Sequence, residues 1–397
     1  MKPVILTFVA YYLPGYRGGG PTRSVANMVE HLSSQFEFKI VTSHTDLGET
    51  IPYENIQIDA WNQIGHAKVY YASLKMRNFK QLSRLISDTP HDLMYLNSFF
   101  DPVFTLRPLL YRLIGSASSR PLIVAPRGEF SSAALRLKGW KKRPFLLFSR
   151  ICGFYREAYW HASSVQEAED IRRTILVHTT KVHMTKAIVV APDLLFAPEH
   201  FPDAKTADFN TNNHRLRVCF LSRIVPMKNL DYALGILAKV KCLVEFNIYG
   251  PKEDLTYWRQ CEVICAQLPS NVIVNYRGGL PHYRVAQVIA EHDIFFVPSR
   301  GENFGHVFLE ALSSGVPILV SDNTPWRNLQ QTGVGWDISL TEPRLFAEAL
   351  DEAAKYSPEE RQCMRRRCLD FARTKIIDPN VRQLNTDLFI NALAIGH

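Results

Sequence analysis

The sequence lacks the features that would set it apart from ordinary globular proteins. It has no low-complexity tract, and its first long apolar run, residues 4–13, is too short to span a bilayer and lacks a small-residue cleavage site. The seven cysteines include no C-x-x-C pair, which argues against a disulfide framework or a zinc site. With 46% hydrophobic and 21% charged residues among 397, we expect a cytoplasmic protein of about two or three domains.

Acidic residues are scarce in the first half of the chain. Residues 1–200 contain 24 Lys and Arg against 16 Asp and Glu, whereas residues 201–397 contain 22 of each, so the first half carries the whole net charge of +8. A basic half indicates an anionic partner, which is nucleic acid, membrane lipid or a phosphorylated substrate. We do not expect nucleic acid, because the basic residues form no stripe along a known binding module.

Apolar strands alternate with amphipathic helices along most of the chain, most clearly from residue 216 to residue 322. This alternation predicts parallel sheets covered by helices on both faces, with ligands beyond the carboxyl ends of the strands. A polar, Asn-rich stretch at 199–214 interrupts it and is typical of a linker. We therefore predict an α/β protein with two Rossmann-like, doubly wound domains, 1–198 and 215–375, which face each other across a cleft.

The stretch GENFGHVFLEALSSG, residues 301–315, places two glutamates around a glycine turn where a helix begins. The first N–H groups of a helix lack partners and favour an anion, and glycine allows close backbone approach. We interpret the turn Asn303-Phe304-Gly305 as a phosphate site, with Glu302 and Glu310 each holding the hydroxyl groups of a flanking sugar. Two glutamates eight residues apart also occur as a solvated loop residue and an exposed helix residue, so the pair alone leaves both interpretations open.

Two motifs together resemble the family 4 retaining glycosyltransferases of the GT-B fold. One is Glu302-x7-Glu310, and the other is Arg223 and Lys228, five residues apart in SRIVPMKN after a strand. The resemblance implies that Arg223 and Lys228 bind the donor diphosphate. It also implies that Glu310 binds the ribose, and that Glu302 and the Asn303–Gly305 turn lie beside the transferred sugar. Arg223, Lys228 and Glu302 would then be the catalytic residues. GT-B chains usually end in a helix that crosses back to the first domain, which residues 376–397 are expected to form.

Fixed cations suit this chemistry because negative charge develops on the departing nucleoside diphosphate. The alternative is that Arg223 and Lys228 are an ordinary basic pair on the surface. The chain contains no Asp-x-Asp, the pair with which other sugar transferases hold a divalent ion. Since the two basic residues would replace that ion, we expect no metal and no other cofactor.

The first half supplies further candidates. In the resemblance, Gly19 and Gly20 of GYRGGG correspond to a glycine pair that contacts the donor phosphates, with a mere tight turn as the alternative. Many family members have a histidine after a mid-domain strand, where VAPRGEF instead presents Arg127 and Glu129. Together with Asn97, which closes LMYLNS, these are candidates for the acceptor side. An ion pair between Arg127 and Glu129 is equally compatible with the sequence, and we interpret His161 as a core or surface residue.

Residues 135–160 interleave basic and aromatic side chains, a pattern typical of interfacial helices. The pattern predicts contact with an anionic membrane surface or a lipid-diphosphate acceptor. The alternative is a helix whose aromatic residues pack inward while its lysines are solvated.

The leading hypothesis is a retaining, metal-independent glycosyltransferase that moves a hexose or N-acetylhexosamine from a nucleotide sugar to a growing, lipid-linked glycan. Leu280, in RGGLPHY, is expected near the base, with a UDP-sugar preferred over GDP-mannose. The loop Thr324-Pro325-Trp326 resembles a bacterial surface-polysaccharide branch, which makes O-antigen or capsule synthesis at the inner face of the membrane the expected context. The alternatives are a nucleotide-sugar epimerase or sugar phosphorylase, which need no acceptor glycan, and a catalytically silent carbohydrate-binding relative.

Overall fold

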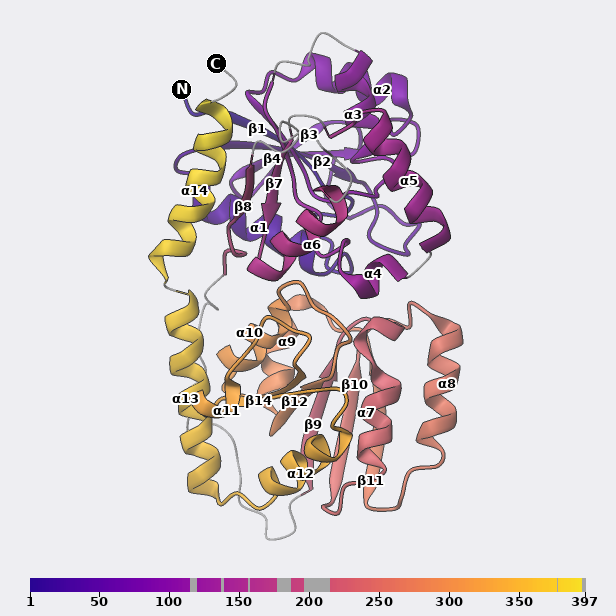
Figure 1. Ribbon diagram of the computed structural model, residues 1–397, viewed down its shortest axis with the longest axis vertical. Coiled ribbons are helices and arrows are strands. Elements are labelled where there is room, and N and C mark those ends of the chain that lie inside the picture. The colour runs from indigo at the N-terminus through magenta and orange to yellow at the C-terminus, as the bar shows by residue number, and fades with distance from the viewer. Residues whose placement is uncertain are drawn as a thin grey trace. The chain divides into compact units, whose positions relative to one another are not determined.

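The computed structural model describes residues 1–114, 120–136, 139–155, 158–176, 187–195, 215–376 and 378–394. The chain forms two compact units (Figure 1). Unit 1 comprises Met1–Leu195 and Asp378–His397, and unit 2 comprises Phe196–Ile377. The expected linker at 199–214 lies outside the described residues.

Unit 1 is built on an eight-stranded sheet with the order β3-β4-β2-β1-β5-β6-β7-β8. All its neighbouring strands are parallel except β3 and β4, which form an antiparallel pair at one edge. The elements of unit 1 are β1 (Val4–Phe8), α1 (Gly20–Leu32), β2 (Glu37–Ser43), β3 (Trp61–Ile64), β4 (Ala67–Ala72), α2 (Phe79–Asp88), β5 (Leu93–Leu96), α3 (Leu106–Ile114), β6 (Leu122–Val124), α4 (Ser132–Arg136), α5 (Gly139–Ile151), β7 (Tyr159–Ala162), α6 (Val165–Leu176), β8 (Ala187–Val190) and α14 (Pro379–Ala394).

The last helix, α14, completes the core of unit 1. Its Phe389 is fully buried, and its ring lies 5.3 Å from that of Phe36 and 5.5 Å from that of Tyr95. Asn385 donates from Nδ2 to the carbonyl of Pro192 at 2.8 Å. Because α14 covers apolar side chains of β2 and β5, this helix is part of unit 1 although 188 residues separate it from β8.

Unit 2 contains a six-stranded, fully parallel sheet with the order β11-β10-β9-β12-β13-β14 (Figure 1). Its inner strands β10, β9, β12 and β13 are short, mostly buried apolar runs, which is the pattern that predicts a parallel sheet, whereas the edge strand β11 is largely exposed. The elements of unit 2 are β9 (Leu216–Leu221), η3 (Pro226–Lys228), α7 (Leu230–Leu237), β10 (Val244–Tyr249), α8 (Leu255–Cys265), β11 (Val272–Gly278), α9 (His282–Ala290), β12 (Ile294–Val297), α10 (His306–Ser313), β13 (Ile318–Ser321), α11 (Leu329–Thr332), β14 (Gly335–Ile338), α12 (Pro343–Ala353) and α13 (Pro358–Ile376).

The strand order of unit 2 reverses between β9 and β12. From β9 the chain proceeds outward through β10 to β11, and after α9 it returns to β12 and proceeds the other way through β13 to β14. Right-handed crossovers therefore place α7 and α8 on one face of the sheet and α9 and α10 on the other. The carboxyl ends of β9 and β12 thus border a topological switch point, where open α/β sheets bind their ligands. The prediction of two Rossmann-like α/β sheets is confirmed.

Candidate functional site

The site residues expected in unit 2 follow the two strands at the switch point. Arg223 lies two residues after β9, and Lys228 ends the short turn η3 that comes next. Glu302 lies five residues after β12, just before α10. Since β9 and β12 are hydrogen-bonded neighbours, two segments about 75 residues apart in the sequence meet at one edge of the sheet.

Lys228 and Glu302 form an ion pair in which the lysine Nζ donates to Oε2 of the carboxylate. Each side chain is only 15% exposed, so the pair is largely removed from water. Asn229 holds the lysine in place: it has left-handed backbone angles (φ 61°) and donates from Nδ2 to the carbonyl of Pro298 at 3.0 Å. Its Oδ1 accepts from Nε of Arg300 at 2.8 Å, and the N–H of Arg300 donates to the carbonyl of Met227.

Arg223 has a different carboxylate partner, Glu253, at 2.9 Å. Both side chains are more than one-third exposed, so this ion pair is open to solvent and weak. Glu253 would therefore compete only weakly with an anionic ligand for Arg223. Glu253 lies in the loop that follows β10. This loop comes close to the end of β9 at Gly250, whose φ is +134°. A Cβ at this position would lie 1.9 Å from the carbonyl oxygen of Ser222, so the approach requires a glycine. Sequence reasoning missed Glu253, although an acidic residue just beyond a parallel strand was a usable signal.

The Asn303-Phe304-Gly305 turn leads directly into α10. Gly305 is the N-cap, with φ +79°, and a Cβ there would lie 2.4 Å from Cδ2 of Phe308. The backbone N–H groups of residues 303–305 have no acceptor within the part of the chain that the structure describes. They lie at the positive end of the helix dipole, so this turn can bind an anion.

Trp326 supports this turn from the loop after β13. Its indole Nε1 donates to the carbonyl of Phe304 at 2.6 Å, and its ring packs edge-on against that of Phe304 with centroids 5.8 Å apart. The sequence analysis singled out the Thr324-Pro325-Trp326 loop only because it resembles a bacterial surface-polysaccharide branch. It did not predict that Trp326 supports the turn before α10. Glu310, the fifth residue of α10, is half-buried, and so is Leu280, in the loop after β11 at the same edge of the sheet.

The two glycines expected to contact phosphate lie at the start of α1 in unit 1. Gly19 is the N-cap of α1, with φ +70°, and Gly20 is its first residue and is exposed. The loop before them is held by Asp46, whose Oδ2 accepts from the backbone N–H groups of Tyr16 and Arg17 at 2.9 and 3.1 Å. These glycines therefore lie in a fixed loop beyond the carboxyl end of β1.

The acceptor-side candidates of unit 1 are buried in hydrogen-bond networks. Arg127 pairs with Asp193 at 2.6 Å, and both side chains are about 95% buried. Its guanidinium also donates to Oδ1 of Asn97 at 3.1 Å and to the hydroxyl of Tyr95 at 2.7 Å. Burial alone would lower the pKa of Arg127, but the oxygens of Tyr95 and Asp193 raise it above its usual value. Arg127 thus stays charged and is fixed at the end of β6.

Glu129 does not pair with Arg127, so that interpretation is wrong. Its carboxylate accepts from Ser98 Oγ at 2.8 Å and from the backbone N–H of Phe99 at 2.5 Å. Burial raises the pKa of Glu129, and these donors oppose the rise. His161 is a core residue that contacts the Tyr95 hydroxyl and the Ala191 carbonyl, and burial lowers its pKa to about 4.

The basic and aromatic segment, which includes helix α5 and the residues that follow it, is partly buried and partly exposed. Phe154 and Tyr155 are buried, and Lys142 turns toward the protein to donate to the carbonyl of Ala134. Five apolar side chains at helical spacing instead remain exposed: Trp140, Pro144, Leu147, Phe148 and Ile151. Lys138 and the side chain of Arg150 lie outside the described residues.

No cluster of three or more His, Cys, Asp or Glu residues within the described ranges has a geometry suited to a metal ion. No helix among those residues is both long and apolar enough to cross a membrane.

Part of the chain matches a known protein family. Residues 203–368 match the model of the family described as "Glycosyl transferases group 1". An uncharacterised 41.2 kDa protein from the cps region of Klebsiella pneumoniae is 22% identical over 315 residues, which are 75% of this chain and 80% of that protein.

Solved structures share the fold over nearly the whole chain. Sucrose-phosphate synthase from Thermosynechococcus elongatus superposes with a TM-score of 0.71 at 15% identity, over 99% of this chain and 100% of that one. WaaG, a glycosyltransferase involved in lipopolysaccharide biosynthesis, gives 0.65 at 13% identity, over 97% and 99%. Alr3699/HepE from Anabaena, solved in complex with UDP-glucose, gives 0.64 at 15% identity, over 99% and 100%. Residues 203–368 therefore match the glycosyl transferases group 1 family, and the chain as a whole shares the GT-B fold of these solved structures.

Proposed function

We propose that this protein transfers a hexose or N-acetylhexosamine from a nucleotide sugar to a growing surface polysaccharide, with retention of configuration and without a metal. One observation carries the proposal. At the switch point of unit 2, the cation of Lys228 and the carboxylate of Glu302 meet beside a helix N-terminus with free N–H groups. Anion-binding groups and a hydroxyl-binding group thus lie together, as a sugar diphosphate requires.

The diphosphate is proposed to bind between the Asn303–Gly305 turn and the two cations. Arg223 can leave Glu253, because an exposed ion pair contributes only about 0–1 kcal/mol. Lys228 keeps its position through Asn229 and can contact the diphosphate and Glu302 together, since an ammonium group has three donors. As the glycosyl bond breaks, negative charge grows on the leaving diphosphate, and these fixed donors stabilise that charge more than the ground state.

The remaining donor and acceptor groups follow from the resemblance. Glu310 is assigned to the ribose, Leu280 to the neighbourhood of the base, and Gly19 and Gly20 to the phosphates. UDP-sugars are the preferred donors, which is consistent with the UDP-glucose complex of the Anabaena relative. Polysaccharide synthesis is the proposed context, since one structural neighbour acts in lipopolysaccharide biosynthesis and the Klebsiella relative comes from a cps region.

The buried state of Arg127 modifies the acceptor hypothesis. Because its guanidinium is committed to Asp193 and Asn97, we assign it the role of positioning the loop after β6. The resemblance to retaining glycosyltransferases implies front-face transfer, in which the departing phosphate itself helps to remove the proton from the acceptor hydroxyl. Glu129 is then not needed as a base.

Helix α5 is proposed to contact an anionic membrane that carries the acceptor. Its exposed stripe recurs every three or four residues, so that Trp140, Leu147 and Ile151 lie along one side of the helix. Lys141 and Arg143 are exposed on the same helix and complement anionic headgroups. Leu147→Glu should abolish sedimentation with anionic liposomes, whereas Val263→Glu, at an equally exposed apolar position of unit 2, should leave it intact. Equal recovery of all three proteins in the supernatant would refute the membrane contact.

The donor assignment is tested by nucleotide release from a panel of UDP- and GDP-sugars, with and without a lipid-linked acceptor. Lys228→Ala and Glu302→Ala should each reduce turnover by about 10²–10³-fold. Lys239→Ala, at an exposed lysine of the same unit, should behave as the wild type. Retained activity in the first two variants would refute the site, and turnover that needs no acceptor would indicate an epimerase or a phosphorylase instead.

A further inference from the structure

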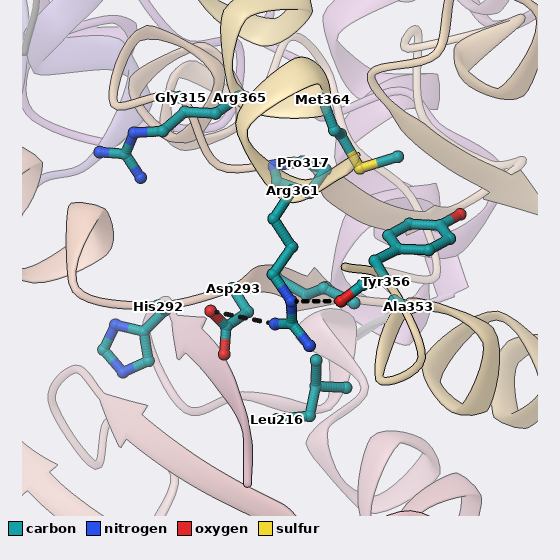
Figure 2. Close-up of a pocket in the computed structure, with 11 residues that line it drawn as sticks. Leu216, His292, Asp293, Gly315, Pro317, Ala353, Tyr356, Arg361, Met364 and Arg365 are labelled. Carbon is teal, nitrogen blue, oxygen red and sulfur yellow. Dashed lines mark hydrogen bonds and ion pairs between the residues drawn. The ribbon is translucent and has the colours of Figure 1, made fainter. Parts of the chain in front are cut away.

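A small cavity lies at the opposite edge of the unit 2 sheet from the donor site. It has a volume of about 30 Å³ and borders the amino ends of three strands, at Leu216, Asp293 and Pro317. Tyr356, before α13, and Arg361 and Arg365, on α13, complete its wall (Figure 2). A volume of this size has room for about two water molecules or for one small anion.

Arg365 is a buried cation that has no direct ion-pair partner among the described residues. Its residue is only 4% exposed, and it neither donates a hydrogen bond nor forms an ion pair with any residue described in the structure. The Nε atom in particular is buried and unsatisfied. Burial is the dominant effect and lowers the pKa of Arg365, although the nearby charge of Asp293 opposes this shift. A bound anion beside the guanidinium would therefore offset a cost that the protein itself offsets only in part.

The other two arginines near the cavity already share Asp293. Arg361 lies 3.5 Å and Arg217 lies 3.2 Å from its Oδ1. Figure 2 draws the bonds of Arg361 to Asp293 and to Tyr356 and draws none for Arg365. His292, which also lines the cavity, is kept neutral because burial lowers its pKa. The charged groups that line the cavity are therefore two arginines and one aspartate, which leaves an excess positive charge.

The side chain of Arg365 is held in position by a glycine. Gly315, which follows α10, has φ +74°, and a Cβ there would lie 2.5 Å from Cγ of Arg365. The arginine thus passes over the end of α10, the helix whose beginning forms the donor site. Neutralising Arg365 would stabilise the packing of α13 on α10 and hence unit 2 as a whole.

We propose that this cavity binds a small oxyanion through Arg365, with the chemistry of inorganic phosphate or of a single phosphate group on a small metabolite. The guanidinium is planar and presents parallel N–H donors, which match two oxygens of such an anion better than a spherical ion. The apolar walls formed by Leu216, Pro317 and Met364 strengthen the attraction by excluding water. This site is separate from the proposed donor site and does not depend on the proposed function.

The test is the thermal stability of the full chain in a low-anion buffer titrated with phosphate, with chloride as a parallel titration. For the wild type, each tenfold rise in phosphate above the dissociation constant should raise the Tm by roughly 3–6 °C. Arg365→Met should remove this response. It should also leave the protein at least as stable as the wild type without phosphate, because a methionine of similar length replaces a charge that is compensated only in part.

Two controls isolate the site. Arg366→Met removes an equal charge from the exposed face of the same helix and should keep the phosphate response. Lys228→Ala should keep it too, which separates this cavity from phosphate binding at the donor site. A response that persists in Arg365→Met, or that chloride reproduces at equal concentration, would overturn the proposal.

Wild-type crystals soaked in selenate provide a readout that does not depend on how any variant folds. The proposal requires an anomalous selenium peak beside the Arg365 guanidinium. A peak only at the Asn303–Gly305 turn would overturn it. Soaks with glucose 6-phosphate in place of selenate then distinguish a free oxyanion from a phosphorylated metabolite.

Discussion

Replacing Gly305 by alanine should destabilise unit 2 more than the same change at any open glycine with similar backbone angles. Gly305 is the N-cap of α10 and has φ +79°. An added Cβ would lie 2.4 Å from Cδ2 of Phe308 and 3.0 Å from Cγ of Glu302. Phe308 is fully buried beneath Trp326, so its ring cannot move aside without disturbing the core.

The expected magnitude has two parts. The left-handed conformation costs an alanine about 1–2 kcal/mol. Forcing a methyl group into a packed core costs about 1–3 kcal/mol more. The free energy of unfolding should therefore fall by about 2–5 kcal/mol in Gly305→Ala.

Gly278 is the matched control. Its φ is +80°, but a Cβ there would have no atom within 4 Å, so Gly278→Ala should show only the conformational part, about 1–2 kcal/mol. The measurement is equilibrium unfolding in urea, followed by tryptophan fluorescence, for both variants and the wild type. If Gly305→Ala is no less stable than Gly278→Ala, the packing of the turn against Phe308 is wrong. Turnover should also fall in Gly305→Ala, because the helix N-terminus is displaced.

Two further predictions concern unit 1, and a third concerns the expected independence of the activity from metal ions. Arg127→Met should lower the free energy of unfolding by about 3–5 kcal/mol, since it leaves Asp193 buried and unpaired, and adding Asp193→Asn should restore at least half of the loss in a double-mutant cycle. The pKa values of His161 and His91 are both lowered to about 4 from 6.5, chiefly by burial, so unfolded chains take up protons first as the pH falls. The free energy of unfolding should therefore have its full value above pH 6.5 and fall by about 3 kcal/mol per histidine as the pH approaches 4. Midpoints of urea unfolding that stay constant over this pH range would contradict the burial of these rings. Transfer activity should be unchanged in excess EDTA, and loss of activity that manganese restores would show that Arg223 and Lys228 do not replace a metal.

Local patterns in the sequence were sufficient for the fold class and for most of the candidate site. Strand periodicity and helix capping depend on residues a few positions apart, so the alternation that predicts a parallel sheet is visible without tertiary information. The same holds for the spacing of Arg223 and Lys228 and for the turn before α10, because each motif lies on a single strand-to-helix connection. A parallel sheet then brings all such connections to one edge, which explains why two separate motifs could be assigned to one site.

Tertiary structure alone decided which charges meet. Lys228 pairs with Glu302 and Arg223 with Glu253 because β9 lies between β12 and β10, and strand order is not encoded in any short stretch. Arg127 pairs with Asp193 although Glu129 lies only two residues away. The energy of an ion pair depends on distance and burial in space, which are properties of packing between segments far apart in the chain. The sequence therefore determined which side chains are present at the sheet edges, and the fold determined which of them are partners.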